Sequence, residues 1–221
     1  MAKQSVTPDR LTATTIAMAA IAIVDRHGPS ALSFRALGDA LGVSQTTVHR
    51  RCGESSTGLL DICMNHLADQ LPATDPNTPW PDAARNAFTA LYELLIAHPG
   101  LVALRGSRPW MGETLLARLT EPLLQSAQTA GLAPVDALRV YRRLYLFTLG
   151  CAAFVDHSDH SDHEETKERT RVGIAMLPPR QFPFLTGNTE AVLEAVVDHD
   201  VFHTGLQQLI DTVALNLYPL R

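Results

Sequence analysis

Apolar residues recur every three or four positions along almost the whole chain, which is the period of an amphipathic helix. The first such pattern covers about residues 9–27 and ends at Gly28 and Pro29. Its broad apolar face consists of Leu11, Ile16, Ala20, Ile23 and Val24. No segment alternates polar and apolar residues as a strand would, so the pattern predicts an all-α fold.

Three shorter helices are predicted next. Ser33 and Ser44 can each cap the start of one, because a hydroxyl oxygen accepts a proton from an otherwise unpaired backbone amide. Gly42, which lies between them, permits a tight turn. We expect these two helices to end near residues 41 and 51, and a fourth helix to run over about 57–71.

The segment 72–81 is rich in proline and interrupts the helical pattern. It predicts a boundary between a small N-terminal domain, residues 1–71, and a larger helical domain, residues 72–221, with the fourth helix as the connector. In the larger domain Pro122 should kink a helix, since proline cannot donate the backbone hydrogen bond, and Pro134 should begin one. We expect a polar loop over about 157–187 and two final helices over about 189–198 and 200–218.

The segment LGDALGVSQTTVHRR (37–51) combines an apolar set with a polar one. The apolar residues should pack the second helix on the third, with small Gly38 where the two helices cross closely. They are Leu37, Leu41, Val43 and Val48. The residues left to face outward are Gln45, Thr46, His49 and Arg50, with Thr47 and Arg51 at the margins.

This outward surface carries hydrogen-bond donors and acceptors but no carboxylate. Pairs four residues apart, 45/49 and 46/50, share one side of a helix. Such a side chain set suits base edges and phosphates in a DNA major groove, and Arg35 lies one turn into the preceding helix. Residues 1–65 carry six basic and five acidic side chains, whereas the remainder carries twelve basic and eighteen acidic ones. A polyanion would therefore meet the N-terminal part.

The stretch FRALGDALGVSQTTVHRR, followed by LLDICMNHL, resembles the TetR family of transcriptional repressors. The segments HPGLVALRGSRP and LYLFTLGCAAFVDH also resemble the C-terminal domain of tetracycline repressors. The resemblance covers most of the chain. It implies an N-terminal helix-turn-helix domain of three helices, followed by a larger helical domain that binds an effector and forms a homodimer.

The resemblance assigns DNA contacts to individual residues. Arg35 and Gln45 fall where such repressors read bases, a guanine and an adenine respectively. Phosphate or backbone contacts fall to Ser33, Thr47, His49 and Arg51, and base or methyl contacts to Thr46 and Arg50. The sequence departs from the family in having His49 in place of an aromatic residue, Cys52 in place of an apolar one and Ser55 in place of a lysine.

In the larger domain the resemblance implies dimer contacts through two helices, about 134–156 and 200–218. The second has an apolar stripe suited to a four-helix seam. Its members are Phe202, Leu206, Leu209, Ile210, Val213 and Leu217. Packing of this stripe inside one subunit is the alternative.

The expected partners are thus a double-stranded DNA operator, a second copy of the chain and a small-molecule effector. Candidate effector-binding residues combine apolar walls with a few polar groups. They are Asn86, Phe88, Tyr92, Arg108, Pro109, Met111, Tyr145, Thr148, Cys151 and Phe154. Of these, Asn86, Arg108 and Pro109 match drug-contacting positions of tetracycline repressors.

Tetracycline repressors hold their drug together with a magnesium ion, through a His and a Glu. The matching positions here are Leu104 and Phe154, and neither side chain can bind a hard cation. We therefore expect no metal and no cofactor in this site, and an apolar effector such as an aromatic metabolite or antibiotic.

Two alternatives stay open. One is a metal-responsive regulator that uses His157, His160 and His163 with neighbouring aspartates in the tract 156–165, where a flexible loop is the competing interpretation. The other is a helical small-molecule-binding protein that does not bind DNA, which the weak net basicity of residues 1–65 favours.

No motif typical of an enzyme active site is present, so we do not expect an enzyme. The odd number of cysteines, Cys52, Cys63 and Cys151, argues against a disulfide framework and for buried thiols in a reducing compartment. No apolar run is long enough to span a bilayer, which favours a cytoplasmic protein without membrane contact.

Overall fold

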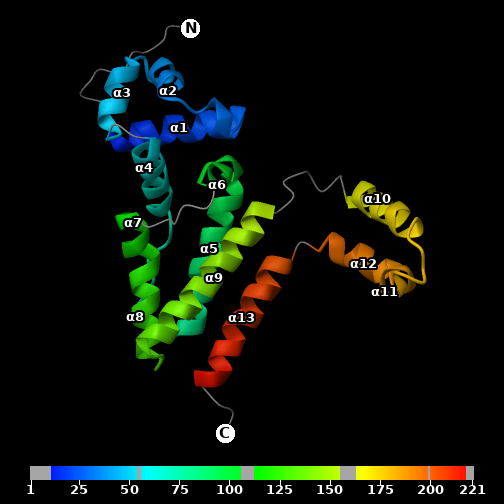
Figure 1. The fold of residues 1–221 in the computed structure, drawn as a ribbon. Coiled ribbons are helices and arrows are strands. Elements are labelled where there is room, and N and C mark those ends of the chain that lie inside the picture. The colour runs from blue at the N-terminus through cyan, green and yellow to red at the C-terminus, as the bar shows by residue number, and fades with distance from the viewer. Residues whose placement is uncertain (1–10, 54–55, 106–111, 155–162, 199, 218–221) are drawn as a thin grey trace. The chain divides into compact units, whose positions relative to one another are not determined.

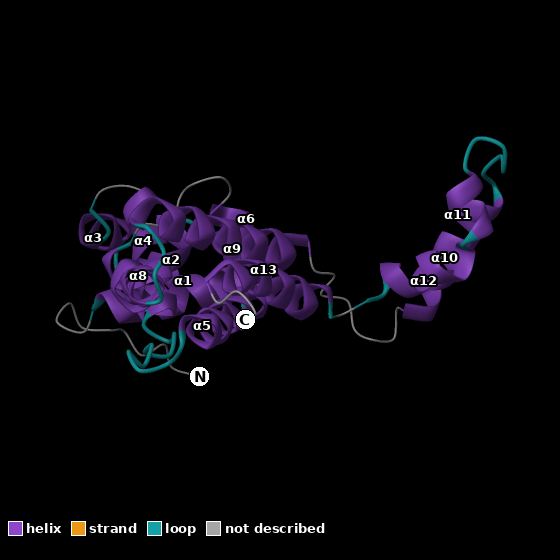
Figure 2. Cartoon of the chain, turned by 90° about the horizontal axis from the view of Figure 1, so that it is seen from below, coloured by secondary structure: helices purple, strands orange, loops and turns teal. Residues whose placement is uncertain are grey.

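The computed structural model describes residues 11–53, 56–105, 112–154, 163–198 and 200–217. Every regular element among these residues is a helix, and none of them lies in a strand (Figure 1, Figure 2). The predicted all-α fold is confirmed. The chain divides into two compact units: unit 1 comprises Met1–Phe154 and Leu206–Arg221, and unit 2 comprises Val155–Gly205. The domain boundary predicted after residue 71 stays a prediction.

The N-terminal head, residues 11–53, contains three α-helices, drawn in blue to cyan near the letter N in Figure 1. They are α1 (Ala13–His27), α2 (Phe34–Leu41) and α3 (Gln45–Arg51), with the short 3-10 helix η2 (Pro29–Ala31) after α1. The first helix starts later than predicted because the Thr12 hydroxyl caps it, accepting a hydrogen bond from Thr15 N at 3.1 Å. A common hydrophobic core holds the three helices together.

The part of unit 1 between α4 (Ser56–Ala68) and Phe154 is a helical body. Its helices are α5 (Trp80–Ala97), α6 (Pro99–Arg105), α7 (Glu113–Leu115), α8 (Glu121–Thr129) and α9 (Pro134–Phe154). The helix α4 packs against α1 on one side and α7 on the other, and α5 packs against α8 and α9. Helix α4 thus contacts helices of both the head and the body.

The helix around Pro122 is irregular, and the predicted kink itself stays a prediction. The π-helical turn η3 (Leu116–Thr120) separates α7 from α8, and Pro122 lies in the first turn of α8. Because proline lacks the amide proton, the regular helical hydrogen-bond ladder cannot run through it. π-helical turns are rare and often occur at functional sites.

The predicted polar loop over 157–187 is wrong in its described part. Unit 2 contains α10 (His163–Ala175), α11 (Pro183–Gly187) and α12 (Thr189–Val196). Helix α10 has few buried residues but pairs its charges three or four positions apart: Lys167 with Glu164, Arg169 with Glu165 and Arg171 with Glu168. Such pairs stabilise a polar helix that an apolar period cannot reveal.

The last helix, α13 (Val201–Leu217), lies where it was predicted, but its apolar stripe is divided. Phe202, Leu206 and Ile210 are buried within the chain, so they are not available to a partner and the predicted seam is wrong for these three residues. Leu209 and Val213 remain half-buried, and the side chain of Leu217 lies outside the described residues. A hydrogen bond from Arg85 Nε to Gln207 Oε1, 2.6 Å long, joins α5 to α13.

The cysteines are not paired with one another. Cys52 and Cys63 are buried, Cys151 is half-buried, and all three are free. Burial raises the pKa of the Cys63 thiol to about 12 and also raises the pKa values of Cys52 and Cys151. These thiols stay protonated at neutral pH, which suits packing rather than metal binding or nucleophilic chemistry.

Within the described residues, no helix combines the length and the apolar character that crossing a membrane requires.

Candidate nucleic-acid interface and effector region

The turn between α2 and α3 is built as the sequence predicted. Ser33 Oγ accepts a hydrogen bond from Ala36 N, and Ser44 Oγ accepts one from Thr47 N, each at 3.1 Å. Gly42 has a φ of 69°, in the left-handed region that glycine adopts without strain, and its amide bonds back to Gly38 O. The turn is therefore set by hydroxyl caps at both helix starts and by a glycine at the end of α2.

Helix α2 crosses the start of α3 closely at Gly38. A β-carbon at this position would lie 2.8 Å from Val43 O and 3.1 Å from Gln45 N, both backbone atoms. Leu37, Leu41 and Val48 are buried beside this crossing, and Val43 packs against the same core. The apolar set predicted from the sequence is confirmed.

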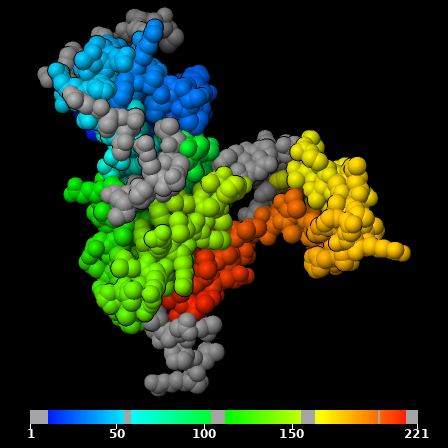
Figure 3. Space-filling view, viewed as in Figure 1, coloured from blue at the N-terminus to red at the C-terminus, as the bar shows by residue number. Residues whose placement is uncertain are grey.

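Burial of Val48 turns the opposite side of α3 to solvent. We define the α3 face as the exposed side chains Gln45, Thr46, Arg50 and Arg51, and Arg35 is exposed on the neighbouring helix α2. The head forms the blue-to-cyan surface in Figure 3. The α3 face has two guanidinium groups, an amide and a hydroxyl, with no carboxylate, so it offers donors and positive charge to an anionic partner.

Two further residues predicted to contact DNA, Thr47 and His49, are less exposed than the α3 face. Thr47 is half-buried, and its hydroxyl is 2.7 Å from Ser44 Oγ. His49 is half-buried too, and its ring meets the Phe34 ring edge-on, with centroids 4.8 Å apart. The spacing 45/49 had predicted that His49 shares the outward side with Gln45, but the aromatic contact draws it toward α2.

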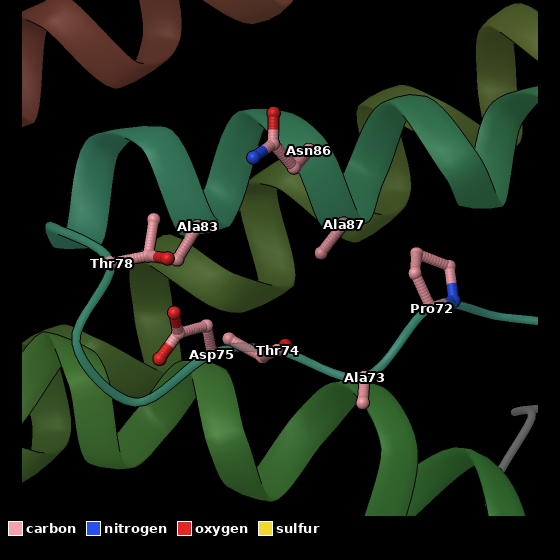
Figure 4. A pocket seen from close by; sticks show the side chains of 8 residues that line it. All are labelled: Pro72, Ala73, Thr74, Asp75, Thr78, Ala83, Asn86 and Ala87. Atoms are coloured by element: carbon pink, nitrogen blue, oxygen red, sulfur yellow. The ribbon is translucent and has the colours of Figure 1, made fainter.

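Asn86 and Phe88, two of the predicted effector-binding residues on α5, do not share one site. Phe88 is buried, whereas Asn86 is exposed. Because residues two apart on a helix point in nearly opposite directions, the two cannot line one pocket. Asn86 instead borders a cleft of about 170 Å³ between α5 and the segment 72–78 (Figure 4). Pro72, Asp75 and Thr78 form part of its other wall.

Phe88 lies in an aromatic region between α5, α8 and α9. Its ring centroid is 5.8 Å from that of Tyr141, which stacks on Tyr145 at 6.0 Å. The cavity that Phe88 and Tyr141 line measures only about 10 Å³, and Trp80, Leu123 and Leu144 close it. This region is thus a packed core that holds no more than about one water.

Tyr141 is a residue that the sequence analysis missed. Its hydroxyl is 2.7 Å from Oγ1 of Thr120, the last residue of the π-helical turn, and burial raises its pKa to about 12. The spacing of Tyr141 and Tyr145, four residues apart on one helix, could have indicated it, because residues at that interval share a face.

Three of the other effector candidates lie on the paired helices α5 and α9. Tyr92 and Thr148 are buried, and the Thr148 hydroxyl donates to Leu144 O at 2.8 Å. Burial and, to a lesser degree, the half-buried Cys151 raise the pKa of Tyr92, so Tyr92 and Cys151 lie near each other. Phe154 is 91% exposed at the end of α9, and its assignment to an effector site stays a prediction. Arg108, Pro109 and Met111, together with the Leu104 side chain, lie outside the described residues.

The tract proposed for metal lies mostly outside the described residues. His157 and His160 fall in the segment that is not described, while His163 begins α10. Among the described residues no three His, Cys, Asp or Glu side chains gather as metal ligands would.

The sequence of the larger helical domain matches a known protein family. Residues 71–216, well over half of the chain, match the tetracyclin repressor-like C-terminal domain family. The chain belongs to the TetR family of transcriptional regulators. The predicted family is therefore confirmed, and it is a family of regulators rather than of enzymes.

A relative from Saccharopolyspora erythraea, an HTH-type transcriptional regulator, is 28% identical over 149 residues. The match covers 67% of this chain and 62% of the relative, which is less than two thirds of the relative's length.

Solved TetR-family structures share the fold. The Streptomyces coelicolor protein ActR in complex with actinorhodin is 20% identical, with a TM-score of 0.78 over 97% of this chain and 98% of ActR. BioQ in complex with its natural double-stranded DNA operator is 19% identical, with a TM-score of 0.63 over 92% of this chain and 98% of BioQ.

Proposed function

We propose that this TetR-family protein is a ligand-responsive repressor, which binds a palindromic operator as a homodimer and leaves it when a small aromatic effector binds. The observation that carries the proposal is the α3 face, which is held outward by the buried Val48 and the close crossing at Gly38. A short helix that projects amide and guanidinium groups from a helix-turn-helix suits the major groove.

The dimer is proposed to form through α9. Its exposed residues recur at the helical period and include three large apolar ones, Val135, Leu138 and Leu146, each more than half exposed. Arg142 and Gly150 lie on the same stripe, and the small glycine leaves room for a second helix to approach. A two-fold axis beside α9 would turn two heads toward one palindrome.

The effector is proposed to enter the aromatic region around Phe88, Tyr141 and Tyr145. Aromatic walls favour a flat, largely apolar ligand, and ActR, a relative of the same fold, is known in complex with actinorhodin. Since the cavity is almost closed, binding of an effector must widen it. In the proposed mechanism the widened form binds DNA more weakly than the closed form. An effector that binds only the widened form therefore lowers the DNA affinity. Calorimetric titration with actinorhodin tests this class of effector, and a lack of saturable binding would count against it.

The reading residues are tested with an operator selected from random DNA by the full-length protein. Arg35→Ala and Gln45→Ala should each weaken operator binding by about 1–3 kcal/mol and relax the preference at one base pair, because each removes a two-point contact to a base edge. Fluorescence anisotropy at fixed salt measures both effects.

Arg26→Ala is the matched control for charge. Arg26 is exposed in the last turn of α1, next to Asp25, which contacts the body. This variant should bind the selected operator like the wild type. Unchanged binding by both Arg35→Ala and Gln45→Ala would overturn the assignment of these residues.

A further inference from the structure

The aromatic region proposed for the effector contains a pair of hydroxyl groups that are bonded to each other. Tyr141 on α9 lines the cavity of this region, and Thr120 ends the π-helical turn η3. The two hydroxyl oxygens are 2.7 Å apart, and both residues are half-buried. The bond therefore joins α9 to an irregular turn of the kind that often occurs at functional sites.

The two hydroxyls together have one hydrogen more than their mutual bond uses. Each hydroxyl can donate one hydrogen, and only one of the two hydrogens can lie between the oxygens. Neither hydroxyl has a second hydrogen-bond partner among the described residues. Burial raises the pKa of Tyr141 to about 12, so the phenol keeps its hydrogen at neutral pH. The pair can therefore donate one hydrogen to a third group.

The other side chains around the cavity carry no charge. Of the described residues that line it, only Tyr141 and Trp80 have polar side-chain atoms, and the Trp80 indole N–H can only donate. The apolar lining residues are Ala84, Phe88, Leu123, Ala127, Ala137 and Leu144. A ligand in this region therefore meets hydrogen-bond donors but no counter-ion.

We infer that Tyr141 is a specificity-determining residue, whose hydroxyl, held by Thr120, donates to an uncharged carbonyl oxygen on a flat aromatic effector. The inference rests on the proposed function and names the chemistry of its effector, which is an aromatic ketone or a quinone. A hydrocarbon of the same shape would leave the hydrogen unpaired once the region encloses it, and an unpaired buried donor is costly. A carboxylate would supply an acceptor, but its charge would be buried without a counter-ion.

The test compares 9-fluorenone with fluorene, two flat three-ring molecules of nearly the same size that differ at one carbonyl group. Equilibrium dialysis against the full-length wild type measures both dissociation constants. The wild type should bind 9-fluorenone at least about tenfold more tightly than fluorene, because only the ketone pairs the hydrogen. Fluorene-9-carboxylate should bind at least about tenfold more weakly than 9-fluorenone, because its charge must leave water.

Tyr141→Phe removes the hydroxyl and keeps the ring. The preference for 9-fluorenone over fluorene should then fall below about threefold, since the Thr120 hydroxyl alone can turn back to a carbonyl oxygen of its own helix. The affinity for fluorene should change by less than about twofold, because the ring contacts with Phe88 and Tyr145 remain.

Thr129→Val is the control for the loss of a hydroxyl group. Thr129 is exposed on α8, and its hydroxyl donates to Gln125 O. This variant should keep the wild-type preference for the ketone.

Three results would each overturn the inference and leave the effector region in place. They are equal affinity of the wild type for 9-fluorenone and fluorene, a wild-type preference in Tyr141→Phe, and tighter binding of the carboxylate than of the ketone. Lack of saturable binding of all three molecules overturns the proposed effector region and this inference with it. A general loss of stability would weaken the binding of all ligands alike, so the ratio between ketone and hydrocarbon separates hydrogen bonding from folding.

Discussion

Gly38→Ala should reduce operator affinity by at least about a hundredfold, because overpacking between two helices displaces one of them. The added methyl group would meet Val43 O and Gln45 N, which are backbone atoms and cannot rotate away as a side chain could. Helix α2 must therefore move off the start of α3, which carries both Arg35 and Gln45 out of their shared geometry. The cost to folding should be about 1–3 kcal/mol, so most molecules should still be folded.

Anisotropy with the selected operator and thermal unfolding followed by circular dichroism measure the two effects of Gly38→Ala. Gly173→Ala, which meets no neighbouring atom, is the control and should leave both unchanged or raise stability slightly. Operator affinity within threefold of wild type in Gly38→Ala would contradict the close crossing as the basis of the interface.

The double variant Leu138→Asp, Leu146→Asp should convert the protein to a monomer and reduce operator affinity by at least about a hundredfold, since a single head makes half the contacts. Both leucines are 54% exposed on α9, so the substitutions should leave the fold of the single chain intact. In a dimer they would place four carboxylates in the seam, where taking charges out of water is costly even with Arg142 nearby.

Sedimentation equilibrium measures the dimer directly, and anisotropy measures the operator affinity. Ala117→Asp, Gln125→Asp is the control, since both residues are exposed and have the same spacing of eight on another stretch of helix. A dimer of wild-type affinity in the α9 variant would exclude this face as the seam.

The sequence predicted the head well because its signals are local. Ser33, Ser44 and Gly42 act within one turn, and the period of Leu37, Leu41 and Val48 specifies which side is buried. The charge pairs of α10 were not recognised, since a polar helix without an apolar stripe resembles a polar loop in composition.

The effector region was predicted less well. Which side chains line a cavity depends on how the helices pack together, and the spacing of apolar residues within one helix does not show this. Asn86 and Phe88 were grouped together although their helix separates them. The contact of His98 with Asp25 spans 73 residues, and no local pattern could have indicated it.

In the proposed dimer two α3 faces, related by a two-fold axis, read one side of a DNA duplex. Hydroxyl-radical footprinting of the wild type on its selected operator shows whether they do. We expect two protected tracts of equal length, related by the operator's symmetry and centred about one helical turn, about 34–36 Å, apart. A single protected tract, or two tracts centred on opposite faces of the duplex, would contradict it.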